Sequence, residues 1–432
     1  MTYPLYHIKC VTIVTLIASI LFFTLGISMA EVSDPTLEKE AETKAVNIEE
    51  CIKIAIENNL QIAAARKGLG TAEADRIKAS LLFPSNPKVI SRVGERDGPD
   101  GARTTDYMVR LSQEFQVFGQ RRKRINVSNK LIERVRFEIF DVERNVIAKV
   151  KSNFYEALTA LEILKLREYI KSIFEKLCNA TRERYKAGAI SALELNSINI
   201  GYGQARQQLL VAKSNYQNSL LGLKLLLGKS RDEALNIDGE LSYEKLQIDL
   251  EDILASAYKI RPDLKAVEFE KERASQEISL RKAERVPNPS LSGFISREER
   301  TDDIVGGFVA ISIPIWDRKQ SELKKARTAK GTASINVKKK QLQIQKEVET
   351  AYRTFMASKG SIAIYTDEII PQVDESLELN EISYKEGKVN FIGFLTVQKN
   401  LLETRAAYLN ALLDYSNAII NLEKVSGTKL II

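Results

Sequence analysis

The 432-residue sequence contains one histidine, three cysteines and one tryptophan. If a leader is removed after Ala30, His7 leaves with it, and only Cys51 and Cys178 remain, in distant segments. A dedicated site for a soft or borderline metal needs histidine or clustered cysteine, so we expect neither a metal nor a cofactor. Nucleophile–base catalysis lacks its parts too, because no Gly-x-Ser-x-Gly or P-loop pattern occurs. We therefore expect no enzyme. The two thiols are more typical of helix packing than of a disulfide. A disulfide between them remains the alternative, because disulfides form in exported proteins.

Glycine, aromatic residues and excess charge are also scarce. An all-β porin consumes glycine and aromatic residues in its turns and strands, and this chain has only 21 glycines. Beyond residue 30 there are 63 basic and 57 acidic side chains, a surplus of only six. A nucleic-acid binder concentrates its basic residues on one face, so we expect no nucleic-acid partner. No proline lies between Pro99 and Pro262, which indicates extended helix.

Residues 1–30 form a candidate targeting segment. Lys9 is its one charged residue, an apolar stretch covers residues 11–27, and Ser28 and Ala30 are small residues where a signal peptidase reads. We predict a signal peptide over 1–30 and export of the chain. An uncleaved membrane anchor remains the alternative, because the apolar stretch is nearly long enough to span a bilayer.

The remaining chain contains two copies of one unit. Residues 185–228 align without gaps on residues 384–427, with ten identities in 44 positions. Chance would give about three at ordinary composition. The segments upstream agree in order as well: a helical pattern, two prolines, an alternating segment and a long helix. We predict a tandem duplication with repeats over 47–230 and 250–428.

Each repeat contains an alternating segment that predicts a β-hairpin. Over residues 305–315 the odd-numbered positions are apolar or glycine, and over residues 107–117 apolar side chains alternate with polar ones such as Arg110 and Glu114. A turn-rich stretch and a shorter strand precede each segment. We place the strands at about 88–117 and about 289–315, which gives four strands per chain.

A long helix follows each hairpin. From Gln120 to Ala187 there are 68 consecutive residues without glycine or proline, enough for a helix on the order of 100 Å long. Apolar residues recur there at steps of three and four, as in a coiled coil. The second copy contains Pro371, near which we expect a kink. Each long helix ends in a glycine turn and a return helix, so we predict antiparallel helical hairpins over 120–228 and 317–427.

Four amphipathic strands cannot close a membrane barrel alone, because an open edge in lipid leaves backbone groups unpaired. Three chains would supply twelve strands, and their helical hairpins would assemble into a long hollow cylinder continuous with the barrel lumen. Such an assembly would be a conduit from the outer membrane across the periplasm. A periplasmic coiled-coil structural or adaptor protein without a pore remains the alternative, since it shares the long helices but needs no lipid-facing strands.

Short motifs appear in the same order in both halves. They are the opening segment 49–59, the pairs Asn86-Pro87 and Asn288-Pro289 before the strands, and two Tyr-x-x-Gly turns at 185–188 and 384–387. Together they resemble the TolC family of outer-membrane efflux proteins, and the resemblance covers nearly all of the mature chain. Residues 113–121 are most similar to the branch associated with heavy-metal cation efflux pumps.

The resemblance implies a mainly α-helical fold with a small β part, assembled as a trimer with a twelve-stranded β-barrel and a twelve-helix α-barrel. The trimer would lie in outer-membrane lipid and extend into the periplasm of a Gram-negative type envelope. It would serve as the passive export duct of a tripartite efflux system, docked to a periplasmic adaptor (membrane fusion) protein and an inner-membrane pump of the RND type. A metal ion, a small toxic molecule and a polypeptide all remain open as cargo.

The same resemblance assigns candidate site residues at the turns and in the barrel. Glu194 is the candidate periplasmic gate, but Gly393 and Thr396 stand in the second repeat where some relatives carry aspartates, so an acidic ring is in doubt. Arg110 and Glu114 would line the barrel lumen. The residues of the adaptor-contact tip would be Tyr185, Gly188, Ser191, Leu193, Tyr384, Gly387 and Asn390. Simpler roles compete: the glycines end helices, Glu194 is a solvated charge, and any pore wall needs a polar face.

Overall fold

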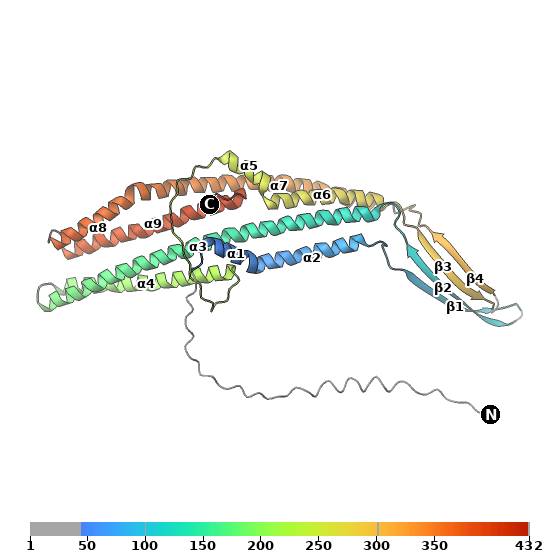
Figure 1. The fold of residues 1–432 in the computed structure, drawn as a ribbon, viewed down its shortest axis with the longest axis horizontal. Coiled ribbons are helices and arrows are strands. Elements are labelled where there is room, and N and C mark those ends of the chain that lie inside the picture. The colour runs from blue at the N-terminus through green and yellow to red at the C-terminus, as the bar shows by residue number, and fades with distance from the viewer. Residues whose placement is uncertain (1–44, 100, 300–301, 431–432) are drawn as a thin grey trace, which may run out of the picture. The chain divides into compact units, whose positions relative to one another are not determined.

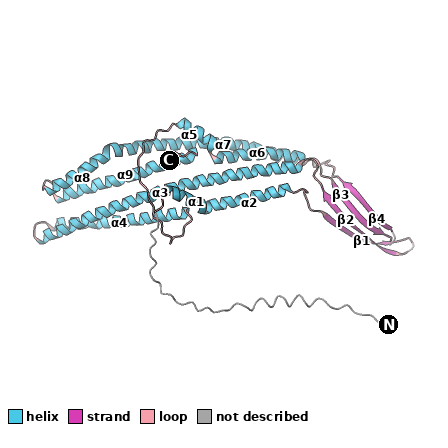
Figure 2. Cartoon of the chain, in the orientation of Figure 1, coloured by secondary structure: helices cyan, strands magenta, loops and turns pink. Residues whose placement is uncertain are grey.

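The computed structural model describes residues 45–99, 101–299 and 302–430, and the predicted signal peptide over 1–30 lies outside them. Figure 1 labels the elements in chain order, and Figure 2 shows helices with one small sheet. The first repeat contains α1 (Ile48–Asn58), α2 (Leu60–Ser80), β1 (Lys88–Asp97), β2 (Arg103–Glu114), α3 (Gln120–Lys186) and α4 (Ala192–Leu226). The second contains α5 (Leu250–Ile260), α6 (Pro262–Ala283), β3 (Ser290–Glu298), β4 (Asp302–Ala310), α7 (Gln320–Ile364), η1 (Tyr365–Ile369), α8 (Ile370–Lys385) and α9 (Phe391–Ser426). The order of elements repeats, so the predicted mainly helical, duplicated fold is confirmed.

The four strands form one antiparallel sheet in the order β1-β2-β3-β4. The two hairpins are joined by the ladder between β2 and β3, in which Tyr107 lies opposite Arg297 and Glu114 lies opposite Ser290. β1 and β4 are the edges of this sheet within the described residues.

Two predicted strand ends need correction. We expected alternation to continue to residues 117 and 315, but β2 ends at Glu114 and β4 ends at Ala310. The reason is the length of the partner strand. β3 begins at Ser290, which pairs with both of these terminal residues, and the preceding residue, Pro289, has no N–H to extend the ladder. Alternation thus continues in the sequence after the partner strand has ended.

The predicted long helix is confirmed, because α3 is continuous over 67 residues. Its apolar seam is buried at Ile139, Val146, Val150, Phe154 and Leu158. In the second repeat the helix changes at the predicted place. The π-helical segment η1 stands directly before α8, and the N–H of Ile370 donates to the carbonyl of Tyr365. None of the described helices has the length and apolar character required to cross a membrane.

Each repeat has its own core, formed where its short first helix packs against its hairpin. In the first core, Cys51 and Ala55 of α1 meet Phe154 of α3 and Leu223 of α4. The second core combines residues of α5, α7 and α9 in the same way, around Phe355 and Tyr415, whose rings lie 5.9 Å apart. Burial of these apolar side chains stabilises the hairpins near the middle of α3 and α7.

The end of α4 is a tight contact that depends on glycine. Gly228 has φ of +68°, and a Cβ added there would lie 2.5 Å from the carbonyl oxygen of Asn58. Gly188, at the other end of the same hairpin, has φ of +73° but open space around it.

We expect Gly228→Ala to destabilise the protein more than Gly188→Ala. Both alanines adopt a left-handed conformation that costs about 1 kcal/mol, but only the alanine at 228 also collides with backbone. Thermal unfolding of the purified protein, followed by helical circular dichroism, measures the difference. Equal shifts in the two unfolding midpoints would contradict this account.

Candidate functional site

The sheet has two chemically different faces. Cross-strand partners share a face, so the registers place nine exposed apolar side chains, drawn from all four strands, on one face. Each of these side chains is more than 40% exposed. They are Val89, Val93, Tyr107, Val109, Leu111, Leu291, Ile295, Val305 and Val309. A contiguous apolar face of this kind is typical of contact with lipid or with another apolar surface.

The opposite face, called the polar face here, combines polar side chains with a few apolar ones such as Phe308, and it contains both residues predicted for the lumen. The guanidinium carbon of Arg110 lies 4.5 Å from the ring centre of Phe308, and one terminal nitrogen donates to the sulfur of Met108 at 3.8 Å. Glu114 accepts a hydrogen bond of 2.6 Å from the side-chain amide of Asn288. Arg110 and Glu114 therefore share a face as predicted, without contacting each other.

At the end of the sheet far from the helices, ion pairs connect the two hairpins. Arg96 of β1 donates to Asp106 at 2.9 Å, to Glu298 at 3.0 Å and to Glu299 at 2.7 Å. The last two carboxylates belong to the second repeat. Arg96 thus holds the loop ends of both hairpins together across β2.

The two helical hairpins end in turns with the same backbone geometry. Gly188 and Gly387 both have φ of +73°. The N–H of Gly188 donates to Tyr185 at 2.9 Å, and the N–H of Gly387 donates to Tyr384 at 3.1 Å. The left-handed conformation of the glycine lets the backbone reverse direction directly after the long helix in each hairpin. Figure 1 shows both turns at the end of the helices away from the sheet.

The return helices begin with side-chain caps. The Ser191 hydroxyl accepts from the N–H of Glu194 at 3.3 Å, and the side-chain oxygen Oδ1 of Asn390 accepts from the N–H of Gly393 at 2.8 Å. Glu194 stands in the first turn of α4, where a negative charge favours the helix, whereas α9 has no acidic residue in its first turn. Of the two return helices, only α4 therefore has an acidic residue at its start.

Each turn has an exposed apolar side chain at the start of its return helix. Leu193 is 74% exposed in α4, and Ile392, at the equivalent position of α9, is 49% exposed. In the second turn Tyr384 stacks on Phe394, with ring centres 4.7 Å apart, and Phe394 is buried. The structure thus brings Tyr185, Ser191 and Leu193 together in one turn and Tyr384 and Asn390 in the other.

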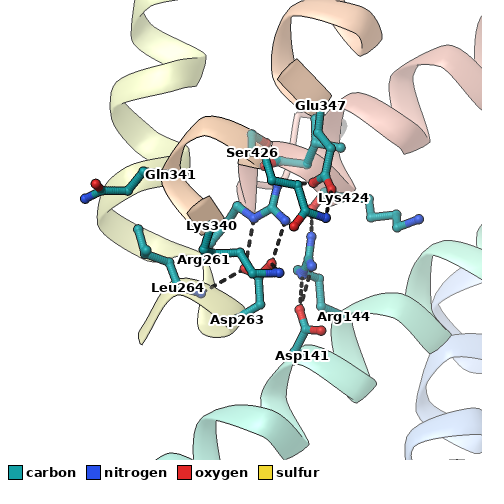
Figure 3. Close-up of polar contacts among 12 residues, drawn as sticks. Asp141, Arg144, Arg261, Asp263, Leu264, Lys340, Gln341, Glu347, Lys424 and Ser426 are labelled. Carbon is teal, nitrogen blue, oxygen red and sulfur yellow. Dashed lines mark hydrogen bonds and ion pairs between the residues drawn. The ribbon is translucent and has the colours of Figure 1, made fainter. Parts of the chain in front are cut away.

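A buried ionic cluster, which sequence reasoning missed, fixes the end of the second hairpin. Figure 3 shows Arg261 at its centre, between α6, α7 and the end of α9. Arg261 is 2% exposed; it donates to Asp263 at 2.7 Å, pairs with Glu347 at 2.7 Å, and donates to the carbonyl of Val425 at 3.2 Å. Arg144 of α3 bonds the neighbouring carbonyl of Lys424. Two cations thus cap the carbonyls that α9 leaves free at its end.

The first repeat has a neutral counterpart of this cluster. Asn59 follows α1 as Arg261 follows α5, and its side-chain amide donates to the carbonyl of Leu226, the last residue of α4, at 2.8 Å. Its oxygen also accepts from the N–H groups of Gln61 and Ile62, which caps α2. We call these two contacts the neutral lock (Asn59 with Leu226) and the charged lock (Arg261 with Asp263, Glu347 and Val425). At equivalent positions of the two repeats, a neutral amide and a buried guanidinium thus each bond a carbonyl at the end of the return helix.

The charges of the lock shift one pKa in a definite direction. Burial of the Asp263 carboxyl raises its pKa, but the hydrogen bond and charge of Arg261, with Arg144 and Lys340 nearby, outweigh burial. The pKa of Asp263 is therefore lowered below its ordinary value of 3.8. An open cavity of about 610 Å³ borders the same residues.

Neither cysteine is part of a reactive site. Cys51 and Cys178 are buried and free of disulfides, as favoured from the sequence. Burial, with a smaller effect of Glu50, raises the pKa of the Cys51 thiol to about 11, so it stays protonated. Among the described residues, no group of three or more His, Cys, Asp or Glu side chains is arranged to hold a metal.

Comparison with known proteins gives consistent matches. The sequence model of the family described as "Outer membrane efflux protein" matches residues 51–229 and 253–428. The cobalt-zinc-cadmium resistance protein CzcC of Cupriavidus metallidurans is 23% identical over 403 residues, which cover 91% of this chain and 92% of CzcC. The toluene efflux pump outer membrane protein TtgI of Pseudomonas putida is also 23% identical, over 86% of this chain and 83% of its own.

Solved structures share the fold. A structure of CusC, described in terms of folding and transmembrane channel formation, superposes with a TM-score of 0.73 at 18% identity, covering 91% of this chain and 96% of CusC. The open-state MtrE outer membrane channel of Neisseria gonorrhoeae gives a TM-score of 0.72 at 17% identity, over 88% of this chain and 89% of MtrE.

The lowered pKa of Asp263 leads to a test of the charged lock. A carboxyl whose pKa is lower in the folded state stabilises the fold above its unfolded pKa, and this stabilisation is lost as pH falls through the folded value. We expect Asp263→Asn to lower the thermal midpoint at pH 7 and the gap to wild type to shrink only below the ordinary value of 3.8. Asp232→Asn is the control, because the Asp232 side chain is 91% exposed. A gap that is absent at pH 7, or unchanged at pH 3, contradicts the assignment.

Proposed function

Because this chain belongs to the outer membrane efflux protein family, we propose that three copies of it assemble into one continuous export duct of a tripartite efflux system. The chain is an outer-membrane efflux channel protein that extends into the periplasm.

The observation that carries the proposal is the sheet, which has one exposed apolar face and two open edges. Its strands have nine to twelve residues, and a tilted strand of about 9–11 residues spans a bilayer. Backbone groups at an open edge have no partner in lipid, so β1 and β4 need neighbours. Alternate strands run in opposite directions, so β4 of one copy can pair antiparallel with β1 of the next. Three copies would close a twelve-stranded barrel. Each copy also has four long helical arms, namely α3, α4, α7 with α8, and α9, so three copies would form the twelve-helix α-barrel.

The turns at the ends of the hairpins are the proposed contact with a periplasmic adaptor protein. Both turns lie at the helix ends away from the sheet (Figure 1), where a duct anchored by the sheet meets its partners. The proposed adaptor-contact residues are Tyr185, Gly188, Ser191, Leu193, Tyr384, Gly387 and Asn390, with Glu194 as the proposed gate residue. We propose the repeat boundaries 47–230 and 250–428 and an inner-membrane pump of the RND type.

The proposed cargo class follows from the more extensive of the two sequence similarities described above. The similarity to CzcC covers nine-tenths of both chains and supports placing this channel in the branch associated with heavy-metal cation efflux. The pore-free coiled-coil alternative is disfavoured by the apolar face, since an adaptor needs no exposed apolar sheet.

Adjacent residues of β4 provide a test of the barrel. Val309 lies on the apolar face and Ala310 on the polar face, because their partners are Leu291 and Ser290. We expect Val309→Asp to reduce the trimer recovered from outer-membrane fractions, because a carboxylate on the lipid face costs about 1–3 kcal/mol per copy. Ala310→Asp should leave trimer recovery unchanged. Equal recovery of the two variants, or a soluble monomeric wild type, would refute the barrel.

Cross-linking tests the adaptor contact. A cysteine introduced as Leu193→Cys at the turn should cross-link to the adaptor in cells that express both proteins. Leu210→Cys is the matched control, because Leu210 is 69% exposed on the same helix but more than four helical turns away. The native cysteines are buried and should not compete. Cross-links at 210 but not at 193 would move the contact away from the turn.

A further inference from the structure

The polar face of the sheet carries three cationic side chains that lie together. Lys88 is opposite Ser112, Arg92 is opposite Met108, and Arg110 is opposite Ile90, which lies between the two cations of β1 on the same face. Arg110 is therefore diagonal to both Lys88 and Arg92. We call these three residues the cationic band.

The band has no matching carboxylates. Throughout the described residues, Lys88, Arg92 and Arg110 form no ion pair, and the side chain of Arg110 contacts the Phe308 ring and the Met108 sulfur instead. In the half of the sheet nearest the helices, which comprises residues 88–92, 108–114, 290–296 and 304–310, Glu114 is the single acidic residue. It bonds to the neutral amide of Asn288. This half of the sheet thus carries a net charge of +2 per chain.

The other half of the sheet has the opposite balance. There Arg96 is paired with Asp106, Glu298 and Glu299, so its charge is more than neutralised. Charge is therefore separated along the strands, and the cations near the helices are left uncompensated. A water-filled pore requires only that its wall be polar, and this requirement does not explain why positive and negative charges are separated along the strands.

This inference rests on the proposed trimeric barrel, in which the polar face lines the lumen. Three copies bring nine cations and three carboxylates to one level of the wall, a net fixed charge of +6. Rings of Lys and Arg select anions in pores, because fixed charge of one sign concentrates the opposite ion.

We propose that the cationic band makes the helix-proximal half of the barrel attract anions, so that small inorganic anions concentrate at this level and raise the anion permeability of the duct. A cationic cargo would then cross this level accompanied by counter-anions. The preference is strongest at low salt, because the screening length is about 10 Å at 0.1 M and about 3 Å at 1 M.

The test is the reversal potential of the purified trimer in a planar bilayer under a KCl gradient. The chloride-to-potassium permeability ratio of wild type should be several-fold higher than that of a variant without the band near 0.1 M, and the two ratios should converge near 1 M. The variant without the band is Lys88→Gln, Arg92→Gln, Arg110→Gln, which should lower the chloride-to-potassium ratio because Glu114 then provides the remaining fixed charge of this level. The triple variant Lys88→Arg, Arg92→Lys, Arg110→Lys is the matched control and should behave as wild type.

The outcomes separate this inference from the proposed function. A wild-type trimer that conducts with a reversal potential unaffected by the glutamine variant overturns the cationic band but leaves the channel intact. A wild-type protein that forms no trimer and no conductance overturns the channel itself. Trimer recovery of both triple variants, measured by size-exclusion chromatography, shows that any change in the ratio arises from charge and not from misfolding.

Discussion

The ladder between β2 and β3 is the contact on which the single continuous sheet depends. It joins hairpins from different halves of the chain into one sheet, and residues as far apart as Tyr107 and Arg297 become neighbours. The apolar face then becomes continuous across both repeats, and the open edges are left at β1 and β4. Because lipid provides no hydrogen bonds to such edges, the same ladder makes assembly with further copies a physical requirement in a membrane.

The two locks show how a duplicated fold can keep its geometry while its chemistry changes. Asn59 and Arg261 occupy equivalent positions and both bond a carbonyl at the end of a return helix. The amide needs little compensation when buried, whereas the guanidinium requires the carboxylates of Asp263 and Glu347. The charged lock also connects α6, α7 and α9, so it holds more elements in register than the neutral lock does.

The two turns show the complementary case, in which backbone geometry is shared and the exposed surface differs. Gly188 and Gly387 have the same left-handed φ, but Glu194 stands in the first turn of α4 where α9 has Gly393. A partner that meets both turns would therefore meet two different surfaces on each copy. Pseudo-symmetric recognition of this kind is consistent with three copies presenting six turns of two kinds.

The sequence by itself determined the features that depend on local periodicity: the duplication, the continuous helix α3, the alternating faces of the strands and the glycine turns. Apolar spacing and the absence of glycine and proline act within one element, so they can be read without a partner. Only the tertiary structure decided where β2 and β4 end, because the ends depend on the length of β3. It also decided that Arg261 pairs with Asp263 and Glu347 and caps a carbonyl 164 residues away, and that Lys88, Arg92 and Arg110 lie together unpaired. Charges acquire their role from their neighbours, and those neighbours come from chain segments that local sequence patterns do not connect.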